Sequence, residues 1–217
     1  MALMSWLRRL GERESRPAPA THVLTHREAT PAESELREQL AEDPNDEAAF
    51  DALVEIVRER ADEGTHRDPL TAPPDTPVAE NHAVWALAEE LAGQPRAWLP
   101  LVVLARLSLT SDHEGAMRRL NLACERETSG LALTHAVAML RDAQAPAEAI
   151  AFGVAHWELA SRDPEAGGEV VMAALETGRI EEARRLLTSL EAASPALSTQ
   201  IGDLERLVSA AEEHTTS

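Results

Sequence analysis

Two consecutive blocks of 34 residues in the second half of the chain, 130–163 and 164–197, carry apolar or small residues at the same positions. Such a period is typical of stacked helical hairpins, because each hairpin has an apolar face that only its neighbour can cover. The repeat therefore predicts a stack of helices whose curved surface can hold a partner. The residues at positions 4, 7, 8, 11 and 20 are Leu133, Ala136, Val137, Leu140 and Ala149 in the first block, and Gly167, Val170, Val171, Ala174 and Ala183 in the second.

The two blocks resemble the tetratricopeptide repeat (TPR) family, whose repeat is a hairpin of helix A and helix B. In that family positions 4, 7 and 11 are bulky, positions 8, 20 and 27 are small, and a Pro stands near position 32. The segment 178–183 (Gly-Arg-Ile-Glu-Glu-Ala) is similar to the family's turn into helix B, and Ser194-Pro195 is similar to its exit. The chain departs from the pattern at Gly167 (position 4) and at Leu190 and His156 (position 27).

Two further hairpins are predicted upstream. A dense apolar segment, 98–105, is followed after a polar turn by helical spacing over 115–123. Earlier, 43–46 (Asp-Pro-Asn-Asp) indicates the end of one helix and the start of the next, whose apolar face carries Phe50, Leu53 and Val57. Its helix B is predicted over 78–91. The intervening segment, 64–77, contains four prolines and is therefore predicted to be a loop, because proline interrupts helices.

These segments predict an all-α fold, and the resemblance implies a right-handed superhelical solenoid of about four TPR-like hairpins with a C-terminal capping helix. The cap is predicted over 196–213, where apolar residues recur at helical spacing between acidic ones. The repeat domain is accordingly expected to span 33–213, followed by a short tail, 214–217. The chain has no Tyr and only two Phe, which also disfavours a β fold.

The single cysteine, Cys124, lies among apolar residues and is predicted to be buried. One cysteine cannot form an intramolecular disulfide framework, which favours a reducing compartment. The first residues lack an apolar stretch of signal-peptide length, and no uncharged run reaches the roughly 18 residues of a membrane span. We therefore expect a cytoplasmic protein without a membrane span.

The formal net charge of −18 is unevenly distributed. Residues 1–28 contain five Arg and three Glu, a net of +2, which leaves −20 for the remainder. Acid is densest over 33–63, where twelve Asp or Glu accompany three Arg. A body this negative repels phosphate backbones, so nucleic-acid binding is not expected. The acidic surface can serve solubility alone, or it can attract a basic segment of a partner.

Catalytic motifs are absent from the sequence, and all twenty cationic side chains are Arg, which excludes a lysine-dependent phosphate site or Schiff base. The eight histidines are scattered and do not form a metal motif. We therefore expect a protein that is not an enzyme and that uses neither a cofactor nor a metal. The leading hypothesis is an adaptor that binds a peptide or helix of another protein.

By analogy with the TPR family, positions 2, 5, 9, 12 and 13 of each helix A face the groove. The first repeat places acidic residues there, including Asp51, Glu55 and Glu59, so a basic and apolar partner segment is expected rather than the acidic C-terminus that some TPR domains bind. The positions concerned are Ala48, Asp51, Glu55, Arg58 and Glu59; Leu131, Thr134, Ala138, Arg141 and Asp142; and Glu165, Gly168, Met172, Leu175 and Glu176. The residues predicted to contact the partner are Asp51, Glu55, Glu59, Leu131, Arg141, Met172 and Leu175.

Residues 1–32 are predicted to be a flexible segment that carries a short basic and apolar island over 4–10. Its candidate contact residues are Trp6, Leu7, Arg8, Arg9 and Leu10. Under the alternative hypothesis, the protein is an accessory subunit that docks through this island on a larger soluble or membrane-associated assembly. Peripheral membrane contact, docking on the acidic groove of the same chain, docking on another protein, and a frayed terminus without a role all stay open on the sequence alone.

Overall fold

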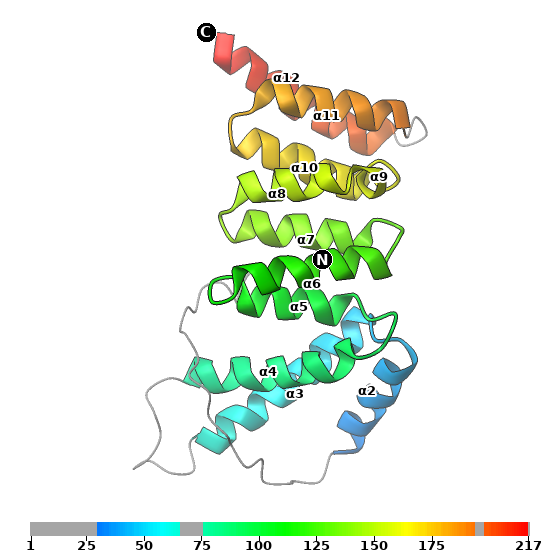
Figure 1. Cartoon of the computed structure of the whole chain (residues 1–217), viewed down its shortest axis with the longest axis vertical. Coiled ribbons are helices and arrows are strands. Elements are labelled where there is room, and N and C mark those ends of the chain that lie inside the picture. Colours follow the sequence, from blue (N-terminus) through cyan, green and yellow to red (C-terminus); the bar gives the residue numbers. More distant parts are fainter. Residues whose placement is uncertain (1–29, 66–75, 194–197, 217) are drawn as a thin grey trace. The chain divides into compact units, whose positions relative to one another are not determined.

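The computed structural model describes residues 30–65, 76–193 and 198–216, and within these ranges the chain forms helices and turns without a β-strand (Figure 1). The predicted all-α class is thereby confirmed for the described residues. The helices are α2 (Pro31–Glu42), α3 (Glu47–Thr65), α4 (Thr76–Ala92), α5 (Leu99–Ser108), α6 (His113–Arg126), α7 (Leu131–Asp142), α8 (Pro146–Ala155), α9 (Trp157–Ala160), α10 (Pro164–Glu176), α11 (Ile180–Ala193) and α12 (Ser198–Thr216).

Most predicted helix boundaries agree with the structure, and three need correction. The turn predicted at 43–46 separates α2 from α3, as expected. The predicted loop 64–77 is shorter at both ends, because α3 continues to Thr65 and α4 begins at Thr76, where proline is tolerated in the first turn. The helix α2 begins at Pro31, inside the predicted flexible segment, with Thr30 as its N-cap. The predicted tail 214–217 is helical as far as Thr216.

The chain divides into two compact units, with the division inside α6 between Arg119 and Leu120. In the first unit, α3 packs against α2 and α4, and α4 packs against α5. The core of this unit contains the fully buried side chains of Leu40, Phe50 and Leu53. The apolar spacing that predicted α3 therefore corresponds to its buried face.

A charged network links three helices of the first unit. Glu33 of α2 is only 3 % exposed, and it accepts hydrogen bonds from Arg60 of α3 at 2.5 Å and from Arg37 at 3.3 Å. Arg37 also donates to both carboxylate oxygens of Glu90 on α4, at 3.0 Å each. The hydrogen bond from Arg60 is the main reason that the pKa of Glu33 lies below its ordinary value. The network fixes the N-terminal end of α2 beside the second half of α3.

In the second unit, α10 packs against α7, α8 and α11, and α12 packs against both α10 and α11. This order is typical of stacked hairpins, in which each helix contacts its hairpin partner and the neighbouring hairpin. The central helix α7 is the most enclosed, because every residue from 132 to 140 is buried. Ile201 and Val208 lie on the buried face of α12.

Gly167 and Leu190, the two departures from the TPR pattern in the last repeat, are in contact with each other. A Cβ at Gly167 would lie 2.6 Å from Cδ1 of Leu190 and 2.9 Å from the carbonyl oxygen of Ala160. The small residue at position 4 therefore leaves the space that the large residue at position 27 fills. A smaller residue at one position and a larger one at the facing position keep the total side-chain volume, and therefore the packing density of the core, unchanged.

The other departure, His156, coincides with a break in the helix that the sequence predicts as helix B of the first block. The helix α8 ends at Ala155, α9 begins at Trp157, and His156 adopts φ −108° and ψ 28° between them. The turn predicted after α10 is also present: Gly178 has φ +70°, a left-handed conformation that glycine adopts at little cost, and α11 begins two residues later.

Candidate protein-binding surface

The acidic face of α3 comprises Ala48, Asp51, Ala52, Glu55 and Glu59, which follow one another at helical spacing on the side opposite the buried residues. Asp51 is half-buried and the other four are exposed. Three of the five groove positions expected from the TPR resemblance carry these acids, and the remaining two, Ala48 and Arg58, are also accessible. The face thus combines small apolar side chains with carboxylates.

Asp51 is the most perturbed group on this face. Its Oδ1 atom is shielded from solvent and accepts no hydrogen bond from the described part of the chain. Burial, with smaller contributions from the like charges of Glu47 and Glu55, raises the pKa of Asp51 to about 6, and Arg58 opposes this only in part. A shielded carboxylate without a donor costs folding free energy. A perturbed group of this kind on an accessible face is a criterion for a candidate site.

The arginines closest to the acidic face are already engaged. Arg58, with a side chain 17 % exposed, donates to Glu55 at 3.3 Å, and Arg60 is paired with the buried Glu33. The side chain of Glu55 is nevertheless 62 % exposed, so it can accept further donors. The face keeps an excess of negative charge, and a cationic ligand would find acceptors at both Asp51 and Glu55.

In the second unit, the predicted contact residues on α7 and α10 have different environments. Leu131 is 39 % exposed, whereas Met172 and Leu175 are half-buried. Arg141 forms ion pairs with Glu169 and with Glu176, the latter at 2.5 Å. Arg141 therefore joins α7 to α10, the two helices that carry the three apolar side chains.

Three groove positions inferred from the TPR resemblance are buried, which corrects that part of the prediction. Thr134 is 6 % exposed and Ala138 is 4 % exposed. Gly168 is also buried, and a Cβ there would lie 3.2 Å from Cδ1 of Leu204, because α12 covers this side of α10. The sequence could not reveal the burial of Gly168, since it depends on where α12 packs.

The N-terminal candidates Trp6, Leu7, Arg8, Arg9 and Leu10 lie outside the described residues. Asp51, Glu55 and Glu59 are the predicted site residues that the structure brings together on a single helix. Leu131, Arg141, Met172 and Leu175 belong to the other unit.

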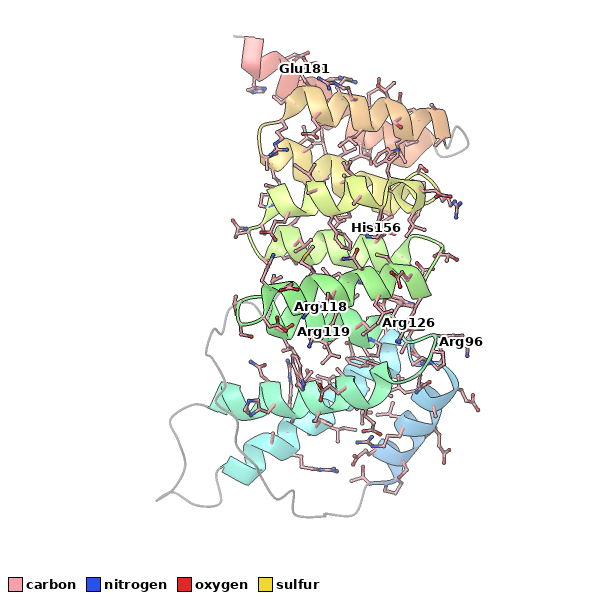
Figure 2. The ribbon with its side chains drawn as sticks, viewed as in Figure 1. Arg96, Arg118, Arg119, Arg126, His156 and Glu181 are labelled. Carbon is pink, nitrogen blue, oxygen red and sulfur yellow. The ribbon has the colours of Figure 1, made fainter. Side chains whose placement is uncertain are left out.

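Aromatic and histidine side chains at the helix surfaces have structural roles. The guanidinium of Arg119 lies 5.1 Å from the ring centroid of Trp85, within cation–π distance. In the second unit, Nε2 of His156, which Figure 2 labels, lies 2.9 Å from Oδ1 of Asn121, and Trp157 Nε1 donates to Ser189 at 3.2 Å. The two contacts in the second unit join residues of α6 to the break between α8 and α9, and α9 to α11. Cys124 is buried as predicted, and burial raises the pKa of its thiol to about 12.

A scan against protein-family models and searches of curated proteins and of solved structures each found no match. None of the described helices combines the length and hydropathy of a membrane span. In the same ranges, no group of three or more His, Cys, Asp or Glu side chains has an arrangement that could hold a metal ion.

Proposed function

We propose that this protein is a non-enzymatic adaptor, built as a right-handed TPR-like solenoid of about four hairpins with a capping helix, and that it binds a basic and apolar segment of a partner protein. The binding surface is the acidic face of α3. Arginine is the expected anchor of the partner segment, because a guanidinium can donate two parallel hydrogen bonds to one carboxylate. The small side chains of Ala48 and Ala52 leave room beside the carboxylates for an apolar side chain.

The observation that carries the proposal is the state of Asp51. An aspartate whose shielded oxygen lacks a donor, between two further acids, destabilises the folded protein at neutral pH. A residue that only keeps the protein soluble would gain nothing from such shielding, since full exposure gives the same charge without the cost. A bound guanidinium would offset the repulsion between Asp51 and its acidic neighbours.

The surface on α7 and α10 is a second contact area in this proposal. Leu131 provides exposed apolar surface, and the Arg141 ion pairs fix the two helices that carry Met172 and Leu175. Hydrophobic anchors of this kind supply most of the affinity of peptide binding, while charges set specificity and association rate. We therefore expect the carboxylates of α3 to determine which partners bind.

The proposal is tested by in-cell cross-linking with the full chain and two variants of equal charge. The first variant neutralises the acidic face (Asp51→Asn, Glu55→Gln, Glu59→Gln). The second, a control, neutralises three exposed acids of α2 in the same unit (Glu35→Gln, Glu38→Gln, Glu42→Gln). We expect a partner, cross-linked through an Arg-containing peptide, that is lost from the first variant and retained by the second. The same set of captured proteins in all three samples would contradict the proposal.

A further inference from the structure

The acidic face of α3 has a candidate occupant in the same chain. Residues 4–16 contain four arginines and two glutamates, together with the large apolar side chains of Trp6, Leu7 and Leu10. This composition is complementary to a surface that combines carboxylates with small apolar residues. It also matches the chemistry that the proposed function expects of a partner segment.

The place where the N-terminal segment joins the described chain lies close to this face. Thr30 caps α2, and one turn later Glu33 is bonded to Arg60 of α3 at 2.5 Å. Arg60 directly follows Glu59 in the sequence, and Asp51 lies about 12 Å further along the helix at 1.5 Å per residue. The attachment point of the segment therefore lies level with the C-terminal end of the acidic face, about 100° around the helix from Glu59.

The length of chain between Arg16 and Thr30 is sufficient to reach every acid on the face. A random coil of 13 residues, the number between Arg16 and Thr30, has a root-mean-square span of roughly 20 Å, which exceeds the length of the acidic stripe. A tether of this length gives an effective concentration in the millimolar range. Even a weak contact between arginines and carboxylates would then be populated within one molecule.

We propose that residues 4–16 dock on the acidic face of α3 of the same chain and that a partner must displace them to bind. The guanidinium groups of Arg8 and Arg9 are the donors for Asp51 and Glu55, and Trp6 packs over Ala48 and Ala52. This proposal rests on the proposed function, because it assigns the same surface. It adds that, in the free protein, the acidic face is covered by the chain's own N-terminal segment. The apparent affinity for a partner is then lowered, because only the undocked fraction of chains can bind it.

The test uses a nitroxide spin label on the full chain. Ser5→Cys provides the labelling site, while Cys124 stays unmodified because it is buried and burial raises its pKa. We expect the label to broaden the amide resonances of residues 48–59. The broadening should disappear in the variant Asp51→Asn, Glu55→Gln, Glu59→Gln and at high salt, since screening weakens exposed ion pairs. It should persist in the control Glu35→Gln, Glu38→Gln, Glu42→Gln.

Three results would overturn the inference. The first is absence of broadening on α3 at low salt, which would leave a terminus without a contact or one that docks on another protein. The second is equal loss of broadening in the control variant, which would show that only net charge matters. The third is broadening that also arises when spin-labelled unenriched protein is mixed with unlabelled 15N-enriched protein, since this would place the segment on a second copy.

The outcomes also separate this inference from the proposed function. If a cross-linked partner depends on the acidic face but the spin label leaves α3 unaffected, the self-docking is wrong and the adaptor proposal stands. If the label broadens α3 but no partner depends on it, the adaptor proposal is wrong and the acidic face binds only its own segment.

Discussion

Asn45 and Trp98, 53 residues apart, are joined by a hydrogen bond of 2.8 Å from the backbone amide of Trp98 to Oδ1 of Asn45. The same oxygen accepts from the amide of Leu99 at 3.1 Å, and Nδ2 of Asn45 donates to the carbonyl of Arg96 at 2.9 Å. One side chain in the turn between α2 and α3 thus caps the start of α5 from a distant part of the chain. Caps are normally supplied by the residue that precedes the helix.

This relationship predicts that Asn45→Ala lowers the free energy of unfolding by about 1–3 kcal/mol, because two backbone donors lose their acceptor. Asn45→Asp keeps the acceptor oxygen and removes only the donor to Arg96, so its loss should be smaller. Urea denaturation followed by circular dichroism measures both. Equal losses for the two variants would show that the cap on α5 contributes nothing.

Gly153 provides a test of the helix packing in the second unit. A Cβ at this position of α8 would overlap the side chain of Val170 on α10. We expect Gly153→Ala to cost about 1–3 kcal/mol through overpacking. Gly202 of α12 is the matched control, because no atom lies within 4 Å of a Cβ there, so Gly202→Ala should stabilise by roughly 0.5–1 kcal/mol. If both substitutions stabilise, α8 and α10 are not packed as described.

The sequence was sufficient for features that depend on local chemistry. The turn 43–46 and the turn at Gly178 were predictable because proline, asparagine and glycine have strong conformational preferences. The buried face of α3 followed from the spacing of Phe50, Leu53 and Val57, since the first two of these are fully buried.

Features that depend on contacts between helices could not be predicted. Gly167 and Leu190 each depart from the TPR pattern, and only the structure shows that they compensate each other. Arg141 was assigned to partner binding, but its contacts with Glu169 and Glu176 require the crossing of α7 and α10. In the candidate site the acids of α3 were predicted from charge, whereas the shielding of Asp51 emerges only from packing.

Glu127 is predicted to make the second unit sensitive to acid. Its carboxylate accepts hydrogen bonds from the amides of Ser129, Gly130 and Ala132, between 2.7 and 3.1 Å, just before α7. Burial alone would raise the pKa of Glu127, but hydrogen bonding by the Ser129 side chain and by these three amides outweighs it and holds the pKa below its ordinary value. The stabilisation is therefore present above the unfolded pKa and is lost as the pH falls through the folded pKa.

Glu127→Gln should accordingly destabilise the protein by about 1–2 kcal/mol at pH 7. The difference from the parent protein should shrink as the pH falls through the folded pKa of Glu127, because Glu127 itself then becomes protonated. Denaturation midpoints measured between pH 3 and pH 7 test this. A difference that is constant over the whole range would exclude the charge of Glu127 as its cause.

The raised pKa of Asp51 predicts that neutralising this residue stabilises the protein at neutral pH, whereas neutralising Glu127 destabilises it. A carboxyl group with a folded pKa above its unfolded value stabilises the protein at low pH, and that contribution is lost as the pH rises through about 6. In a chain whose N-terminal arginines are neutralised (Arg8, Arg9, Arg13 and Arg16 all to Gln), Asp51→Asn should therefore stabilise at pH 7.5. We expect a gain of about 1–2 kcal/mol after allowance for solvent screening.

In the natural sequence the gain from Asp51→Asn should be smaller, because the docked arginines already relieve the repulsion. The difference between the two gains is the coupling free energy of a double-mutant cycle. Additive effects of the Asp51 and arginine substitutions would argue against contact between them.

The most direct measurement is the binding of a synthetic peptide, residues 4–16, to the full chain in which Arg8, Arg9, Arg13 and Arg16 are Gln. Amide chemical shifts of the protein are followed by NMR as the peptide is added. If the acidic face of α3 recognises basic segments, the shifts will concentrate on residues 48–59, weaken with added salt, and vanish for a peptide whose arginines are Gln. Shifts that lie elsewhere, or that are unchanged when the peptide loses its arginines, would contradict the account.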